Sequence, residues 1–214
     1  MNDEAMKIYI IRHGETALNV KGVMQGRIDE PLNQSGRDLA AVTGRAIKGI
    51  RFDNCVSSPL LRAVETAKTV LTESGNSIPI VTDERLLEID FGDMEGKKLS
   101  DMGEAGRAFF TAPLDFGRFP NGESVYDVCE RTQDFIKELI AKDDGKTYLI
   151  STHGCAMRAM LNFLTDDPSD FWRGHAPYNC SFCIVEAKGG SAALTDIDKV
   201  YYDRALIVDR FKKA

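Results

Sequence analysis

Met6-Lys-Ile-Tyr-Ile-Ile-Arg12-His13-Gly14 is a short apolar run that ends abruptly in two basic side chains and a glycine. Its length and β-branched content predict a strand over residues 6–12 that is buried on both faces. A second stretch, Lys146-Thr-Tyr-Leu-Ile-Ser-Thr-His153-Gly154, repeats the design, with a predicted strand over residues 146–151. Ligands of open α/β sheets bind beyond the carboxyl ends of strands, so the two histidines face one cavity if these strands are neighbours.

The rest of the chain alternates between strand and helix patterns. We expect strands over 52–57 and 80–82, helices over 35–49, 59–74 and 156–164, and a closing strand pair over 179–186 and 192–197. The first of these helices begins with Ser35 as its expected cap. This alternation predicts an α/β three-layer sandwich, with a mostly parallel sheet and helices on both faces.

Residues 92–143 interrupt this alternation with a mostly helical pattern that breaks at Pro113 and around Pro120-Asn-Gly122. We expect this stretch to form a helical cap inserted over one end of the sheet. The chain has 214 residues, a length that a single core commonly serves. We therefore expect one domain spanning residues 1–214.

The charge balance restricts the classes of partner. The chain has 27 Lys and Arg against 33 Asp and Glu, which gives a formal net charge of −6. This balance leaves no electrostatic footprint for nucleic acid or for an anionic membrane, so we expect neither as a partner. An anionic substrate would have to be attracted by a local cluster of cations. The acidic N-terminus matches neither a signal peptide nor a membrane span, so we expect a cytoplasmic protein.

The cysteines and histidines predict no metal site and no disulfide framework. Five cysteines are an odd number, and their spacing matches neither zinc knuckles nor a dense set of bridges. Cys180-Ser-Phe-Cys183 lies in a strand-like run, so we interpret this C-x-x-C pair as core packing. With three histidines in the chain, a histidine-rich metal site is not expected. We expect neither a metal ion nor a cofactor.

Cations accompany the two strand-end histidines. Arg12 adjoins His13, and Arg62 lies one turn into a predicted helix that follows a strand. Helix N-termini favour anions, and arginine can clamp a phosphoryl group with two parallel hydrogen bonds. An ordinary surface ion pair explains Arg62 about equally well.

An acid also stands near a predicted turn. Glu88 lies among apolar residues in Leu86-Leu-Glu-Ile-Asp-Phe-Gly92, which suits a proton donor near neutral pH. Asp90 and Glu95 are competing acids nearby, and the residues alone do not rank the three.

Arg12-His13-Gly14-Glu-Thr16 at the end of a first strand resembles the signature of the histidine phosphatase superfamily, the phosphoglycerate mutase-like family. The resemblance runs in order over nearly the whole chain, from residue 6 to about residue 185. Its further pieces are Asn19, Gln25-Gly26, Asp29-Glu-Pro-Leu32, Gly36, Ser57-Ser-Pro-Leu60, Arg62-Ala63, Thr66-Ala67, Glu88-Ile-Asp-Phe-Gly92, Glu95-Gly96, Gly122-Glu-Ser124 and Thr152-His-Gly154.

This resemblance implies a two-step phosphoryl transfer. His13 would attack phosphorus to form a phosphohistidine, and water would then hydrolyse it. Glu88 would protonate the leaving alcohol and later act as a base toward water. The phosphoryl oxygens would be bound by residues of several loops, with no metal needed: Arg12, Asn19, Gln25, Gly26, Arg62, His153 and Gly154.

Within the family, the residues look more like the phosphatase branch than the mutases, which are usually longer before the Gly-Glu-Ser segment. We therefore expect a phosphomonoesterase of the histidine acid phosphatase type that acts on a small phosphorylated metabolite. Phosphatases of α-ribazole phosphate, sugar phosphatases and broad phosphomonoesterases are the candidates. A phosphoglycerate mutase, and a non-catalytic module that binds phosphorylated ligands, remain as alternatives. Relatives are often dimeric, which leaves a homodimer open.

Two departures from the family bear on substrate shape. The family often has Trp where Met94 stands, and Gly or Glu where Cys155 stands. Cys155 beside His153 could be taken for a nucleophile, but packing is the more common role of such a residue. Near the predicted edge of the site, His175, Tyr178 and Asn179 could contact a ligand, although structural roles are more common. The expected cap is rich in residues that either line a ring-binding wall or form its own core: Arg107, Phe109, Phe110, Phe116, Arg118 and Phe119.

Overall fold

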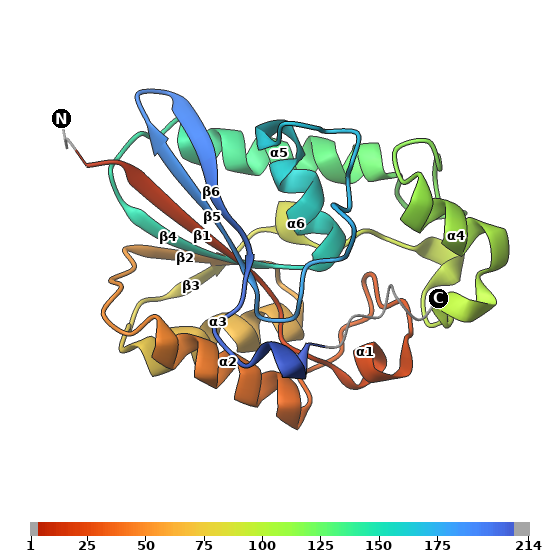
Figure 1. Ribbon diagram of the computed structural model, residues 1–214, viewed down its shortest axis with the longest axis horizontal. Coiled ribbons are helices and arrows are strands. Elements are labelled where there is room, and N and C mark those ends of the chain that lie inside the picture. The colour runs from red at the N-terminus through yellow and green to blue at the C-terminus, as the bar shows by residue number, and fades with distance from the viewer. Residues whose placement is uncertain (1–3, 208–214) are drawn as a thin grey trace.

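A computed structural model describes residues 4–207 (Figure 1). Six strands form one sheet in the order β3-β2-β4-β1-β5-β6. The strands are β1 (Met6–Arg12), β2 (Asn54–Ser57), β3 (Ile80–Thr82), β4 (Thr147–Thr152), β5 (Phe182–Lys188) and β6 (Ser191–Lys199). The helices are α1 (Ala17–Lys21), α2 (Gln34–Ala46), α3 (Leu61–Ser74), α4 (Gly103–Thr111), α5 (Val125–Ile140) and α6 (Gly154–Leu161). Short 3-10 turns are η1 (Glu84–Leu86), η2 (Gly92–Met94), η3 (Leu99–Asp101), η4 (Asn162–Leu164) and η5 (Arg204–Leu206).

The sheet is mostly parallel, as the alternation of strands and helices predicts. β1 pairs in parallel with β4, and Arg12 lies opposite Thr152 at the carboxyl ends of the two strands. β4 continues in parallel to β2, and β2 to β3. β5 and β6 complete the sheet as antiparallel strands beside β1. The two strands that lead into His13 and His153 are therefore neighbours.

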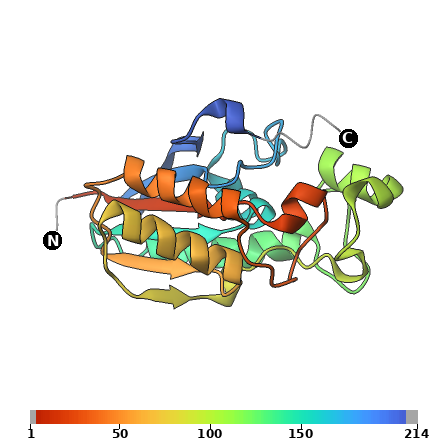
Figure 2. The same cartoon turned by 90° about the horizontal axis from the view of Figure 1, so that it is seen from below.

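Helices cover both faces of the sheet, with α2 and α3 on one side and α5 and α6 on the other (Figures 1 and 2). β1 contributes to both cores because its alternate side chains point to opposite faces. Ile10 packs in the cluster that contains Ile136 of α5, and Ile11 packs in the cluster that contains Val70 of α3. The prediction of a first strand buried on both faces is confirmed.

The expected cap over residues 92–143 is too long. α5 carries Ile136 and Leu139 into the core between the sheet and α6, so this helix is part of the sandwich. Its strongly one-sided apolar face explains this position, because such a face must be buried against another element. The segment from η2 through α4 to residue 124 extends beyond the strand ends (Figure 1). The cap therefore comprises residues 92–124.

Two element boundaries differ from their predictions for local reasons. Asn33, not Ser35, caps α2, because its side chain accepts the backbone N–H of Gly36 at 2.7 Å. The strand expected from residue 179 begins only at Phe182, because Cys180 adopts a left-handed φ of 56° that breaks the extended run. This turn releases Asn179 from the sheet and directs it toward β1.

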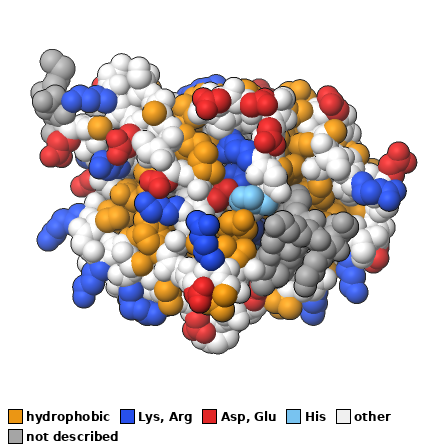
Figure 3. Space-filling view, viewed as in Figure 1, with side chains coloured by type: hydrophobic (Ala, Val, Ile, Leu, Met, Phe, Trp, Pro, Cys, Tyr) orange, Lys and Arg blue, Asp and Glu red, His pale blue; other side chains and the backbone are white. Residues whose placement is uncertain are grey.

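All five cysteines are free thiols, and Cys180 and Cys183 are fully buried in the core. The interpretation of this pair as core packing is confirmed. No helix within residues 4–207 is long and apolar enough to cross a membrane. Acidic and basic side chains are interspersed over the face shown in Figure 3, with apolar side chains between them.

Candidate active site

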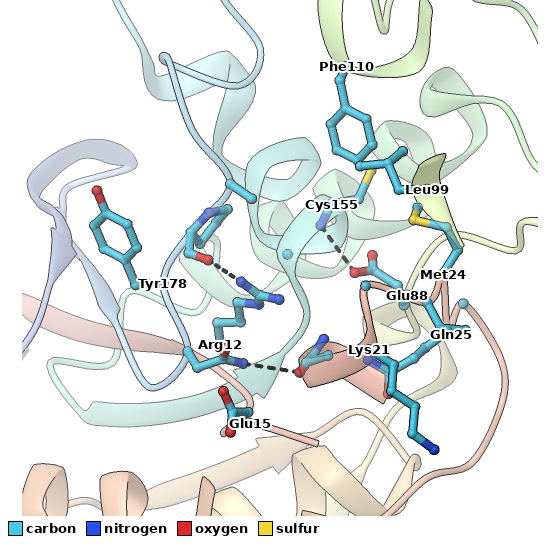
Figure 4. A pocket seen from close by; sticks show the side chains of 18 of the residues that line it. Arg12, Glu15, Lys21, Met24, Gln25, Glu88, Leu99, Phe110, Cys155 and Tyr178 are labelled. Carbon is cyan, nitrogen blue, oxygen red and sulfur yellow. Dashed lines mark hydrogen bonds between the residues drawn. The ribbon is translucent and has the colours of Figure 1, made fainter. Parts of the chain in front are cut away.

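A cavity of about 890 Å³ opens beyond the carboxyl ends of β1 and β4. It lies between the loops that follow these strands, the segment after α1, and the cap (Figure 4). Of the residues proposed from the sequence, those that line it are Arg12, His13, Asn19, Gln25, Gly26, Arg62, Glu88 and Gly154. His153 is completely buried directly behind this wall.

His13 has one ring nitrogen fixed and the other available. Its Nδ1 lies 2.7 Å from the carbonyl oxygen of Gly14, and a carbonyl only accepts, so Nδ1 carries the proton. Nε2 is then the unprotonated nitrogen, as a nucleophile requires. Burial, followed by the positive charges of Arg62 and Arg12, lowers the pKa of His13 well below its usual value. The ring is neutral at physiological pH.

His153 is an orienting residue in this structure. The rings of His13 and His153 lie 5.2 Å apart between centroids. Nδ1 of His153 accepts the Nε–H of Arg62 at 3.2 Å, so its proton is on Nε2, which donates to Ser58 Oγ at 2.7 Å. Burial, followed by the charge of Arg62, lowers the pKa of His153 well below its usual value.

Arg62 is held in place by backbone carbonyls. It is 1% exposed, and its two terminal nitrogens donate to Ile28 O at 2.6 Å and Gly26 O at 2.7 Å. Burial lowers the pKa of Arg62 to about 10, which leaves the guanidinium charged near neutral pH. A positive charge therefore stands at the floor of the cavity in a fixed orientation.

Arg12 supplies a second cation, and its guanidinium donates to Pro177 O (Figure 4). Gly154 lies between this cation and Glu88: a Cβ at residue 154 would be 3.6 Å from Arg12 Nε and 3.8 Å from Glu88 Oε2. A side chain at this position would enter the space between cation and acid. The glycine keeps that space open.

The segment after α1 brings Asn19, Gln25 and Gly26 to the cavity. Asn19 forms a capping box with Thr16, and Thr16 also donates its hydroxyl to Gln25 Oε1 at 2.9 Å. Gly26 has a φ of 50°, and a Cβ there would lie 2.0 Å from Glu95 Oε1. Glycine is thus required where the chain turns to present its carbonyl to Arg62.

Glu88 is the predicted acid that the structure brings to the cavity. Its carboxylate accepts N–H groups from Cys155 at 3.2 Å and from Ala156 at 3.0 Å, in the first turn of α6. Neither Asp90 nor Glu95 lines the cavity. Asp90 accepts the N–H of Gly92 at 2.7 Å, and Glu95 accepts that of Arg27 at 2.6 Å.

A network behind Glu88 has no counterpart in the sequence-based site. The backbone oxygen of Glu88 accepts from Arg27 Nε at 3.0 Å and from Arg131 Nη2 at 3.1 Å. Glu123 bridges both arginines, at 3.2 Å from Arg27 Nη2 and 2.9 Å from Arg131 Nε, and accepts the N–H of Asp90 at 2.9 Å. Burial raises the pKa of Glu123, but hydrogen bonds from Arg131 outweigh it and hold that pKa below its usual value.

The sequence indicates only one member of this network. Glu123 belongs to the Gly-Glu-Ser segment of the resemblance, whereas nothing in the order of residues singles out Arg27 or Arg131. Ser58 accepts a hydrogen bond from His153. It lies in the Ser57-Ser-Pro-Leu60 part of the resemblance, which implies no role for this residue. These partners come from separate segments and meet only when the chain folds.

Of three further residues expected near the edge of the site, two line the cavity and one packs behind it. Tyr178 and Asn179 line the cavity, and Asn179 Nδ2 donates to His13 O at 2.9 Å. His175 does not line it and stacks on Tyr178, with ring centroids 4.5 Å apart. Asn179 thus fixes the backbone of the histidine, a contact that becomes available through the turn at Cys180.

Cys155 is a buried part of the cavity wall. It is 3% exposed, and burial raises the pKa of its thiol well above the usual value. A thiolate is therefore not favoured there. Among residues 4–207, no group of three or more His, Cys, Asp or Glu side chains could hold a metal ion.

Known proteins resemble this chain in sequence and in fold. The family model described as "Histidine phosphatase superfamily (branch 1)" matches residues 8–199. The solved structure "Bacillus stearothermophilus YhfR" is similar with a TM-score of 0.84 and 34% identity, covering 92% of this chain and 98% of that one.

Two curated relatives carry different activity names. A "2,3-bisphosphoglycerate-dependent phosphoglycerate mutase" of Cytophaga hutchinsonii is 30% identical over 73% of this chain and 76% of its own length. A Hydrogenobacter thermophilus protein named "Putative phosphoserine phosphatase 2" is 29% identical over 94% of this chain and 98% of its own.

The first prediction concerns the charge state of the buried histidines. Burial and the neighbouring guanidinium groups both disfavour the imidazolium, so the His13 and His153 rings should be neutral at pH 6.5. Nitrogen-15 NMR of histidine-labelled protein, assigned with His13→Gln and His153→Gln, would measure this. A titration midpoint at or above pH 6.5 for either ring would contradict it.

The second prediction concerns Glu123 as a positioning residue. Glu123→Gln keeps the shape of the side chain but removes the charge that holds Arg27 and Arg131 on the carbonyl of Glu88. Small displacements of a reacting group cost up to about 100-fold in rate, so kcat should fall about 10- to 100-fold with little change in KM. Glu130→Gln, which changes an exposed carboxylate on the helix α5 that follows Glu123, is the matched control. Equal effects of the two substitutions on kcat, or a change confined to KM, would oppose this role.

Proposed function

The chain belongs to the histidine phosphatase superfamily, and from its site we propose that it is a phosphomonoester hydrolase that works through a phosphohistidine on His13. One observation carries the proposal. The proton of the buried His13 ring is held on Nδ1 by Gly14 O, so Nε2 is unprotonated, and His13 lines a cavity together with the guanidinium groups of Arg12 and Arg62. This combination suits nucleophilic attack on an anionic phosphoryl group.

In the first step, His13 Nε2 attacks phosphorus, and the bond between phosphorus and the ester oxygen breaks. The Glu88 carboxyl donates its proton to the departing oxygen, which leaves as the alcohol. Arg12 and Arg62 stabilise the charge on the three non-bridging oxygens. Asn19, Gln25 and the backbone at Gly26 and Gly154 contribute polar groups around the same space.

In the second step, water attacks the phosphohistidine. The Glu88 carboxylate accepts a proton from that water, the bond between phosphorus and Nε2 breaks, and inorganic phosphate leaves. His153 takes part by orienting Arg62, since its ring lies behind the cavity wall. Its direct contact with phosphate, which the resemblance implies, would require Arg62 or the His153 ring to move.

The cavity at His13 is large enough to admit water, which hydrolysis of a phosphohistidine requires. A mutase must keep water away from the phosphoenzyme. Relatives named as mutases keep phosphoglycerate isomerisation as the second candidate.

Three further parts of the proposal follow from the same site. The substrate is a small phosphomonoester, and the charge needed for catalysis comes from arginine side chains without a metal ion. The proposed compartment is the cytoplasm, where the five free thiols are stable in their reduced form. The α-ribazole phosphate and sugar phosphates are candidate substrates, and a homodimer is compatible with the site.

The third prediction tests the reaction itself. Phosphate should be released from a panel of phosphomonoesters in the presence of EDTA, and acid-labile label should accumulate on the protein during turnover. His13→Ala should remove both while the thermal melt is retained. Conversion of 3-phosphoglycerate to 2-phosphoglycerate without phosphate release would instead indicate a mutase, and a folded His13→Ala variant with most of its activity would refute the nucleophile.

The fourth prediction tests the acid. Glu88→Gln removes the proton that the leaving oxygen takes, so alkyl phosphates should slow by about 100- to 10,000-fold, the usual contribution of general acid catalysis. p-Nitrophenyl phosphate should slow far less, because p-nitrophenolate leaves without protonation. Equal losses on both substrates would move the acid role to another residue.

A further inference from the structure

The cavity has two chemically different parts. His13, Glu88 and the arginines line its floor, whereas one part of its wall is apolar. The cap also contributes Lys98, Ser100, Arg107 and Thr111 to the lining. Four side chains that lie together on this wall come from four separate segments: Met24, Leu99, Phe110 and Cys155 (Figure 4). They all stand on the Glu88 side of the cavity, away from Tyr178 (Figure 4).

Most of the cap aromatics do form the cap's own core. Phe109 and Phe119 are each 1% exposed and pack edge to face, with ring centroids 5.2 Å apart. Phe116 and Arg118 do not line the cavity. Phe110 differs, because it is only partly buried and its ring lies on the cavity side, against Trp172 at 5.5 Å.

The wall is held in place by backbone and side-chain contacts. The segment after α1 pairs with the cap, since Met24 N donates to Lys97 O at 2.9 Å and Leu99 N donates to Gly22 O at 3.0 Å. The polar group of Trp172 is already used, because its indole N–H donates to Phe109 O at 3.0 Å. Trp172 therefore offers the cavity only its apolar ring.

The position of Glu88 decides which part of a substrate meets this wall. Glu88 accepts the N–H of Cys155 at 3.2 Å, so the acid and the apolar wall are adjacent. The ester oxygen that Glu88 protonates belongs to the alcohol. The carbon atoms next to that oxygen are then on the side of the cavity where Cys155 and Leu99 lie (Figure 4).

A hydroxyl group placed on such a wall loses its water without gaining a partner, which is costly. An apolar carbon at the same place releases water and is stabilised. The other cations that line the cavity, Lys21 and the cap residues Lys98 and Arg107, are exposed. They suit the steering of an anionic substrate toward a protein of net charge −6.

We propose that the substrates of this site are phosphomonoesters of apolar alcohols, whose carbon skeleton next to the ester oxygen carries no hydroxyl groups. This inference rests on the proposed function and specifies its substrate class. This narrows the candidates that the family resemblance supplies. Sugar phosphates and phosphoglycerate are then poor substrates, because their hydroxyl groups fall on the wall formed by Met24, Leu99, Phe110 and Cys155.

The experiment compares two substrates that differ in polarity and share a shape. Cyclohexylmethyl phosphate is glucose 6-phosphate without its ring oxygen and hydroxyl groups, and both are esters of primary alcohols of similar basicity. Phosphate release should give a kcat/KM at least about tenfold higher for the cyclohexylmethyl ester, the size of discrimination that an apolar pocket provides. A ratio of one or less would overturn the inference.

Wall variants locate the preference. Phe110→Ser and Leu99→Gln should each lower the kcat/KM ratio about tenfold. Phe163→Ser, which changes a part-exposed phenylalanine of η4 outside the cavity, should leave the ratio unchanged. If Phe110→Ser does not fold, Leu99→Gln carries the test from a different segment. An unaltered ratio in a folded wall variant would overturn the inference.

The same assays distinguish loss of the apolar preference from loss of the proposed phosphatase activity. Release of phosphate from both esters at equal kcat/KM would leave the phosphatase intact and remove the apolar preference. Release from neither ester, and none from p-nitrophenyl phosphate, would remove the phosphatase and the preference together.

Discussion

Arg62 carries a permanent positive charge into the protein interior, and within residues 4–207 no carboxylate lies within ion-pair distance of it. Removing such a charge from water costs several kcal/mol unless other groups replace the water. Here the carbonyls of Gly26 and Ile28 and the ring of His153 do so in part. These neutral acceptors fix the guanidinium but do not neutralise it. The remaining positive potential is what an incoming phosphoryl group would meet.

The same charge constrains the groups around it. Burial, and after it the charge of Arg62, lowers the pKa of both histidines, so both rings are neutral near pH 7. The chain between α1 and α2 must present two carbonyls inward, and Gly26 makes this turn with a positive φ that a side chain would obstruct. One buried cation therefore contributes to the neutral state of His13 and is held in place by the loop that contains Gly26.

Much of the scaffold is predictable because it depends on patterns that are local in the chain. Two short β-branched runs, each ending in His-Gly, indicate neighbouring strands, and β1 and β4 do lie side by side. The boundary of the cap was not predictable in this way. A helical pattern shows that α5 is a helix, but only packing shows that Ile136 faces the sheet while Phe110 faces the cavity.

The residue order alone specified the chemistry at the strand ends: a histidine, its neighbouring arginine, a second arginine at a helix start, and an acid among apolar residues. Tertiary structure decided how these groups work together. It placed His153 behind Arg62 and brought Glu88, rather than Asp90 or Glu95, to the cavity. It joined Arg27, Glu123 and Arg131 behind Glu88. It also set the polarity of the wall beside Glu88. The reason is physical: side-chain identity is a property of each position, whereas burial, hydrogen-bond partners and local potential depend on segments that meet only in the folded chain.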